Sequence, residues 1–165
     1  MNMLNTRSSA VSSAPLLSPS QPELEEVWLR LKHLEATYPG FRSWFWSKVA
    51  PGVGAGERRV FTHTGRDGVD GAVIAKSDDR ERKLCTIWVA PAARGRGVAS
   101  DLVDEALDWL KDPHPLLTVP DERLAELTPL VRARGFRLTQ RIRSCYREGR
   151  VEHIFNGSLI PCLNA

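Results

Sequence analysis

The sequence has few of the features that mark exported, membrane-spanning or metal-binding proteins. Its 165 residues include only three cysteines, Cys85, Cys145 and Cys162, with no C-x-x-C spacing. This odd number argues against a disulfide framework and against a zinc site, so we expect buried or free thiols and no metal. No apolar run approaches the roughly 18 residues of a membrane span, and the N-terminal stretch has no continuous apolar core typical of a secretory signal. We therefore expect a cytoplasmic protein.

The composition is that of an ordinary globular domain, with 42% hydrophobic and 26% charged residues. The length suits one compact unit with a sizeable core. Residues 1–20 are rich in Ser, Ala and Pro, which predicts a flexible N-terminal tail. We expect the folded domain to span residues 21–157 and a C-terminal tail to span residues 158–165.

Hydrophobic periodicity predicts two helices followed by three strands. Apolar residues recur at helical spacing from Pro22 to Thr37, and a shorter helix is expected from Phe41 to Val49, ended by Pro51, Gly52 and the glycines at 54 and 56. Strand patterns follow at residues 58–64, 71–76 and 83–90, separated by polar turns. Strands this close in sequence predict an antiparallel meander.

The second half alternates helices with strands. The pattern predicts an amphipathic helix from Val98 to Lys111, a short strand from Leu116 to Val119, and a helix from Glu122 to Arg134 that ends at Gly135. Strands at 136–146 and 151–156 are expected to form a hairpin. This order predicts a mixed α/β fold whose sheet contains one parallel crossover in its middle.

The turn between the third strand and the following helix holds two glycines, Gly95 and Gly97, and two arginines, Arg94 and Arg96. The first amides of a helix lack partners, and the helix dipole favours an anion beside them. Glycines allow close approach of a ligand, Ala99 keeps the next turn small, and the arginines add positive charge. The stretch matches neither G-x-x-x-x-G-K-[ST] nor G-x-G-x-x-G, which disfavours nucleoside triphosphate hydrolysis. It indicates a phosphate site, although glycines also serve purely structural turns.

The stretch V-A-P-A-A-R-G-R-G-V-A resembles the acyl-CoA signature of the GNAT superfamily of N-acetyltransferases, R/Q-x-x-G-x-G/A after a strand that ends apolar-x-P. Arg94, Gly97 and Ala99 occupy its defining positions. The element order also matches, from about residue 22 to residue 157. The resemblance implies a GNAT-like mixed, mostly antiparallel sheet of six to seven strands with a central splayed parallel pair and about four helices. The family's usual first strand is hard to find in residues 1–20.

The same resemblance implies an enzyme that transfers an acyl group, most simply acetyl from acetyl-CoA, directly to a primary amine of a small molecule or macromolecule. The amides from Gly95 to Ala99 would cradle the CoA pyrophosphate, and the main chain of Ile87 and Val89 would pair with the pantetheine arm. The thioester would lie between the strands at 83–90 and 116–119. The predicted cofactor-binding residues are Ile87, Trp88, Val89, Arg94, Gly95, Arg96, Gly97, Val98, Ala99 and Ser100.

Transfer to an amine requires a base for the amine and an acid for the departing thiolate. Many relatives place a tyrosine acid four residues before the glycine of a G-F pair, where this chain has Val131. Tyr146 is our candidate replacement, because period-two alternation puts it on one strand face with Leu138 and Ile142. A phenol at the core edge, another donor, or unassisted departure of the weakly basic thiolate are the alternatives.

The base is less well marked. Glu81 and Glu152 are the candidates, with Glu81 our choice and His153 and His63 as weaker options, although no spacing singles one out. Cys85 is expected to be a small buried hydrophobe rather than a nucleophile, on the face of Ile87 and Val89 if the strand has no bulge. The following aromatic residues should lie where the family's first two helices roof the acceptor, mostly as core: Tyr38, Phe41, Trp44, Phe45 and Trp46.

Positive charge is concentrated near the C-terminus, although the net charge is only +3. A solvated face is the simplest interpretation of the four arginines predicted opposite Leu138 and Ile142, namely Arg137, Arg141, Arg143 and Arg147. They could also grip phosphates, so a nucleic-acid-modifying or nucleic-acid-binding protein is a second hypothesis. An inactive CoA-binding regulatory protein is a third, prompted by Val131. The acceptor follows no motif. The protein is expected to be a monomer or homodimer, because an exposed final strand and residues 158–165 could pair with another subunit.

Overall fold

The computed structural model describes residues 21–159, and the side chains from Glu23 onward. The predicted N-terminal tail, any first strand within residues 1–20 and residues 160–165 lie outside the described residues. The helical elements are α1 (Gln21–Leu31), η1 (Lys32–Ala36), α2 (Phe41–Trp44), the π-helical turn η2 (Phe45–Val49), α3 (Ala50–Gly54), η3 (Pro91–Ala93), α4 (Val98–Leu110), η4 (Asp121–Arg123) and α5 (Leu124–Ala133). The strands are β1 (Arg58–Gly65), β2 (Gly68–Ser77), β3 (Arg82–Val89), β4 (Leu116–Pro120), β5 (Leu138–Arg143) and β6 (Val151–Phe155).

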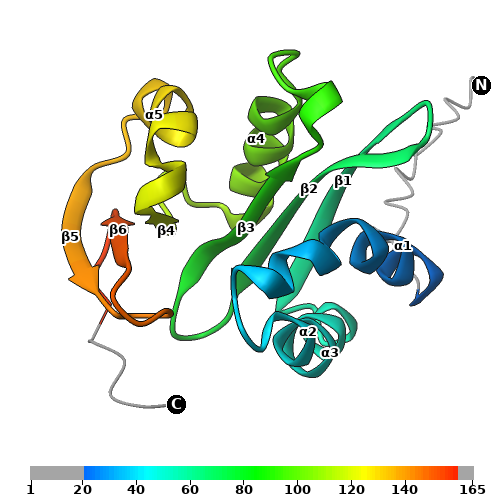
Figure 1. Ribbon diagram of the computed structural model, residues 1–165, viewed down its shortest axis with the longest axis horizontal. Helices are drawn as coiled ribbons and strands as arrows, with labels where there is room; N and C mark the ends of the chain where they lie inside the picture. The colour runs from blue at the N-terminus through cyan, green and yellow to red at the C-terminus, as the bar shows by residue number, and fades with distance from the viewer. Residues whose placement is uncertain (1–20, 160–165) are drawn as a thin grey trace, which may run out of the picture.

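One six-stranded sheet organises the fold, in the order β1-β2-β3-β4-β6-β5 (Figure 1). The pairs β1–β2 and β2–β3 are antiparallel, which confirms the predicted meander, and β3–β4 is the predicted parallel pair. That parallel pair consists of Lys83 opposite Leu116 and Leu84 opposite Leu117. Beyond these residues β3 and β4 diverge, so the centre of the sheet is splayed. The predicted mixed, mostly antiparallel sheet with a central splayed parallel pair is therefore confirmed.

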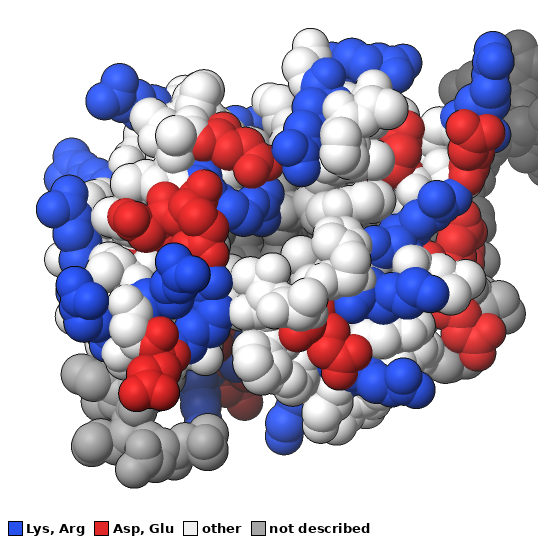
Figure 2. Space-filling model, viewed as in Figure 1, with Lys and Arg blue, Asp and Glu red and all other residues white. Residues whose placement is uncertain are grey.

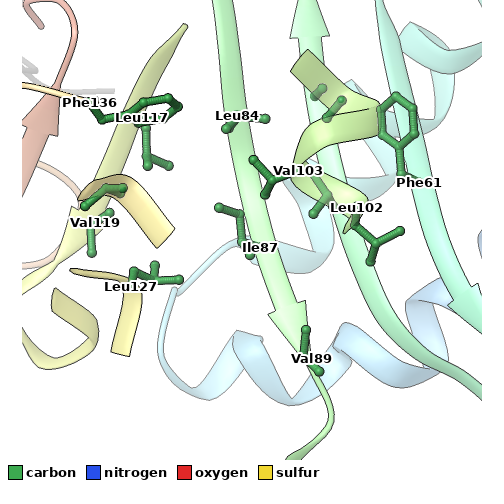
Figure 3. Close-up of a cluster of buried hydrophobic side chains, with 14 of the residues drawn as sticks. Phe61, Leu84, Ile87, Val89, Leu102, Val103, Leu117, Val119, Leu127 and Phe136 are labelled. Carbon is green, nitrogen blue, oxygen red and sulfur yellow. The ribbon is translucent and has the colours of Figure 1, made fainter. Parts of the chain in front are cut away.

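The sheet carries a separate core on each face. Helices α4 and α5 cover one face, where Leu84, Ile87 and Val89 of β3 meet Val103 of α4 and Leu127 of α5 (Figure 3). The segment from α1 to α3 covers the other face, with Trp88 of β3 among its buried residues. Alternation along β3 therefore assigns neighbouring residues to different layers. None of the helices in the described part of the chain has the length and apolarity needed to cross a membrane.

The C-terminal hairpin differs from its prediction. The first strand is β5, shorter than the predicted 136–146, and β6 lies between β4 and β5. The exposed edge is therefore β5 rather than the final strand. Ser144 adopts a left-handed backbone conformation with φ 59°, and its amide donates to the Arg150 carbonyl at 2.7 Å. This closes the ladder after Arg143 and places Tyr146 in the connecting loop instead of on a strand.

The helix predicted from Phe41 to Val49 continues to Gly54, one of the glycines expected to end it, rather than ending before Pro51. A wide π-helical turn precedes the proline, with the Ala50 amide bonded to the Phe45 carbonyl. Proline has no amide to pair and is tolerated in the first turn of the α3 segment. Pro51 therefore does not end the helix, which ends at Gly54 instead.

The core on the α4 side offers a direct test of this architecture. Leu84 is fully buried on β3 at the last parallel pair. Replacing Leu84→Ala should lower the free energy of unfolding by about 2 to 5 kcal/mol, because a cavity opens beside α4. Urea denaturation measures the change. Leu29→Ala, at a position that is 60% exposed on α1, is the matched control and should shift stability by no more than about 0.5 kcal/mol. Equal effects would contradict this assignment of the core.

Candidate functional site

The glycine turn between β3 and α4 has the geometry of an anion cradle. Gly95 and Gly97 have φ of 72° and 85°, a region that residues with a Cβ rarely adopt. A Cβ at either position would have no heavy atom within 4 Å, so the turn is open on its outer side. Among the described residues, no hydrogen bond is formed by the amides from Gly95 to Ser100, and the first helical amide to pair is that of Asp101, to the Gly97 carbonyl. These amides are free to hold a phosphate.

A cavity of about 350 Å³ lies beside this turn, between β3, the start of α4 and the length of α5. It is lined by all the residues predicted to bind cofactor except Trp88 and Arg96. Trp88 points into the core beneath α1–α3, and Arg96 is exposed. The cavity is also lined by residues that the sequence analysis did not select: Ala93, Arg123, Glu126, Leu127, Pro129, Leu130, Ala133 and Arg134. The cavity therefore has a polar end at the turn and an apolar wall along α5.

Two arginines fasten the cavity walls. Arg94 Nε donates to the Val89 carbonyl at 3.1 Å, so its side chain folds back over the end of β3. Arg134, at the end of α5, donates to the Ser100 carbonyl at 2.9 Å and to Ser100 Oγ at 2.8 Å, and it pairs with Asp104 of α4 at 2.7 Å. The Ser100 hydroxyl thus already has a partner. Arg134 therefore links the end of α5 to the first turns of α4, beside the cavity.

A buried polar cluster lies on the opposite face of the sheet. Glu152 of β6 is 1% exposed and sits opposite Pro120 of β4. Arg147 reaches it from the β5–β6 loop, with Nη2 3.5 Å from Glu152 Oε1 and Nη1 2.5 Å from Glu122 Oε1. The Arg147 guanidinium also lies over the ring of Tyr38, 4.9 Å from its centroid. The cluster joins the α1–α2 connection to the far side of the splayed strands.

Burial controls the ionisation of this cluster. It raises the pKa of Glu152 above its ordinary value, although the guanidinium of Arg147 opposes the shift. It also raises the pKa of Tyr38 to about 12, with the nearby Glu152 carboxylate adding to the effect. Tyr38 therefore keeps its proton at neutral pH, while Glu152 takes up a proton more readily than a solvated glutamate.

Tyr146 lies in the β5–β6 loop, where it is 45% exposed, and does not share a strand face with Leu138 and Ile142. Its hydroxyl oxygen accepts a hydrogen bond from Lys83 Nζ at 3.1 Å, and the same ammonium is 5.6 Å from the ring centroid. Burial lowers the pKa of Lys83, but Tyr146, Cys85 and Glu81 outweigh that effect, so the pKa lies above its usual value. The phenol is thereby anchored beside the start of the splayed pair.

The other candidate bases are engaged elsewhere. Glu81 lies before β3, at the end remote from the glycine turn, and its Oε1 accepts from Lys76 Nζ at 2.8 Å. His63 of β1 has Nδ1 2.5 Å from Asp70 Oδ1. His153 is buried, with Nε2 2.7 Å from Asp121 Oδ1, and alternation turns it toward the α5 face. Among the four candidates, Glu152 is thus the carboxylate placed in a buried cluster on the face opposite the cavity.

Cys85 does not face the side of Ile87 and Val89. The β2–β3 pairing carries a bulge between Leu84 and Thr86, and Cys85 packs against the core under α1–α3. Its Sγ accepts from Arg58 Nη1 at 3.5 Å. Burial raises the pKa of the thiol, which disfavours a nucleophilic thiolate. Cys85 is half-buried rather than fully buried, and its raised pKa agrees with the expectation that it is not a nucleophile.

The arginines do not form the single strand face that alternation predicted. A bulge between Leu138 and Gln140 reverses the alternation, so Leu138 and Arg141 lie on the same face. Arg147 does not belong to an exposed arginine face, since only 11% of its side chain is exposed. Figure 2 shows cations along the edge formed by β5, next to a group of acidic side chains over the region of η4 and α5. The surface beside the site is therefore mixed in charge.

Comparison with known proteins agrees with this geometry. The family model described as Acetyltransferase (GNAT) family matches residues 23–126, and the chain belongs to that family. No curated protein matches the sequence. The protein is accordingly an acetyltransferase whose donor is an acyl-CoA, and the open turn, its unpaired amides and the adjoining cavity suit such a donor.

Solved structures share the fold. A putative GNAT acetyltransferase from Desulfovibrio desulfuricans has a TM-score of 0.67 at 16% identity, with 82% of this chain and 92% of that chain covered. NAA60 from Arabidopsis thaliana, solved with acetyl-CoA, has a TM-score of 0.66 at 16% identity, with 82% and 93% covered. Nourseothricin acetyltransferase has a TM-score of 0.54 at 25% identity, with 60% of this chain covered, and this chain spans 64% of that protein.

The glycine turn provides a test of donor binding. Gly97→Asp should weaken acetyl-CoA binding roughly tenfold or more, because it forces a side chain into a left-handed backbone and adds a negative charge at the amides. Isothermal titration calorimetry measures the dissociation constant. Gly54→Asp, in a helix where a Cβ meets no atom within 4 Å, is the control and should leave binding unchanged. Equal affinities for the two variants would remove the cradle from the site.

Proposed function

We propose that the protein transfers acetyl from acetyl-CoA directly to a primary amine. The observation that supports this most is the arrangement around the splayed strands. Unpaired amides and an apolar cavity lie on the α4–α5 face, and a buried carboxylate, Glu152, lies on the α1–α3 face. A donor and an acceptor can then approach the gap from opposite sides of the sheet.

The chain's own residues would hold the donor in a defined orientation. The amides from Gly95 to Ser100 would hold the diphosphate, and the carbonyls of Ile87 and Val89 would accept from the pantetheine amides. When bound, the acyl-CoA supplies an activated thioester. Cys85 argues for direct transfer, since it is half-buried on the face of β3 opposite Ile87 and Val89 and its pKa is raised, which favours the thiol over the nucleophilic thiolate.

Glu152 is the proposed base for the amine. An amine at neutral pH is mostly an ammonium ion and must lose a proton before it can attack. A carboxylate whose pKa is raised by burial accepts that proton better than a solvated one. Arg147 and Tyr38 position it, because Arg147 is braced between Glu122 and the Tyr38 ring. Relatives act on acceptors as different as nourseothricin and ribosomal protein S18, so we propose only the amine class here.

Removing the proposed base should change both rate and pH dependence. In the wild type kcat/KM should fall as pH decreases through the raised pKa of Glu152, because the protonated acid cannot accept a proton. Glu152→Gln should lower kcat about 100-fold or more and abolish that acidic limb. Acetylation of a panel of amines can be measured by the release of free thiol from acetyl-CoA. Measuring the rates between about pH 5 and 9, in steps of about one pH unit, gives both effects. Glu81→Gln is the comparison variant, and the reverse pattern would assign the base to Glu81.

Tyr146 is the proposed acid for the thiolate. Tyr146→Phe should lower kcat by about 100-fold while leaving the dissociation constant for acetyl-CoA unchanged, because the hydroxyl is needed only as the thiolate departs. Tyr38→Phe is the matched variant, since Tyr38 is the chain's other tyrosine and its ring would still contact Arg147. Initial rates and calorimetry separate the two effects. A larger loss in Tyr38→Phe than in Tyr146→Phe would transfer the acid role to Tyr38.

A further inference from the structure

One side chain spans the splayed gap between β3 and the segment that follows β4. Arg123, the last residue of η4, donates from Nη1 to the Ile87 carbonyl on β3 at 2.8 Å. Glu126 of α5 holds the same guanidinium, with Oε1 2.9 Å from Nη2 and Oε2 3.3 Å from Nε. Both side chains line the cavity. The Arg123 side chain therefore connects β3 to η4, at a point where the backbones of β3 and β4 have already separated.

The bridge uses a carbonyl that a bound donor also needs. Within residues 21–159, β3 has no neighbouring strand beyond Leu84 on its β4 side, so its outward carbonyls require another partner. Arg123 supplies one for Ile87, and Arg94 supplies one for Val89. A pantetheine arm that pairs with β3 in the manner of a strand would address these two carbonyls. Ligand and arginine therefore compete for the same acceptor.

We propose that Arg123 is a gate on the donor cleft, which occupies the Ile87 carbonyl in the ligand-free protein and swings away when an acyl-CoA binds. The proposal rests on the donor site assigned above. The Arg123 and Glu126 side chains are 28% and 40% exposed, so the pair has room to move outward toward solvent together. Arg123 is thus a positioning residue that sets the width of the cleft and the rate of donor entry.

The alternative is that Arg123 grips a phosphate of the donor. The geometry favours the gate for two reasons. The guanidinium is neutralised by a two-point contact with Glu126, which leaves little net charge for an anion. The unpaired amides that suit a diphosphate lie instead in the glycine turn, from Gly95 to Ser100. The two roles predict opposite effects on affinity, which makes them separable.

The test compares Arg123→Ala with the wild type in binding acetyl-CoA. With the competing side chain gone, the dissociation constant should fall about 2- to 12-fold and the association rate should rise, as measured by calorimetry and stopped-flow tryptophan fluorescence. The melting temperature of the ligand-free protein should drop, and saturating acetyl-CoA should restore most of the difference. Arg132→Ala, an exposed arginine of α5 outside the cavity, is the control and should change none of these values.

Arg123→Gln is the second variant in case the alanine protein folds poorly, because it keeps a polar stem but cannot span the gap. It should shift affinity in the same direction. Weaker binding of acetyl-CoA in both variants would show that Arg123 contacts the ligand. Unchanged affinity and association rate would show that Arg123 does not compete with the ligand for the Ile87 carbonyl. Either result would overturn the proposed gate. Failure of the wild type itself to bind acetyl-CoA would instead overturn the donor site, which keeps the two hypotheses distinct.

Discussion

The structure depends on the short parallel pairing of β3 and β4. Only Lys83 and Leu84 of β3 pair with β4, and the two strands then separate, with Leu127 of α5 in the core beside Val119 of β4 (Figure 3). A backbone edge in the middle of a sheet is normally satisfied by its neighbour. Here the backbone groups of β3 that face the gap can instead pair with side chains or with a ligand. The cavity on the α4–α5 face and the Arg123 bridge both lie along that separation.

The two faces of the gap have different chemistry because different helices cover them. On the α4–α5 face, the start of α4 offers unpaired amides and α5 offers an apolar wall. On the α1–α3 face, Tyr38 and the β5–β6 loop enclose Glu152 and Arg147 away from water. The proposed anion binding and the proposed proton transfer would therefore take place in separate environments. A raised pKa for a base can coexist with a cradle that favours negative charge, because the sheet stands between them.

Much of the fold was accessible from local patterns. The meander, helix α4 and the glycine turn each depend on residues close in sequence, so they can be predicted without knowledge of the tertiary structure. The errors occurred at irregularities that leave no local signature. Because of bulges after Leu84 and Leu138, Cys85 and the β5 arginines lie on other faces of the sheet than alternation predicts. Tyr146 lies in a loop, because β5 ends at Arg143. Arg123 and Glu126 carried no motif and were found only through their contacts.

By itself the sequence determined the glycine turn and the class of ligand it suits, because left-handed backbone angles and unpaired amides are properties of a few consecutive residues. Only the tertiary structure decided which charged side chains matter. Glu81 and Glu152 are equivalent in sequence, yet one lies in a surface ion pair with Lys76 and the other is buried against Arg147. Burial depends on what the rest of the chain packs over a residue, and that is settled by contacts between distant segments.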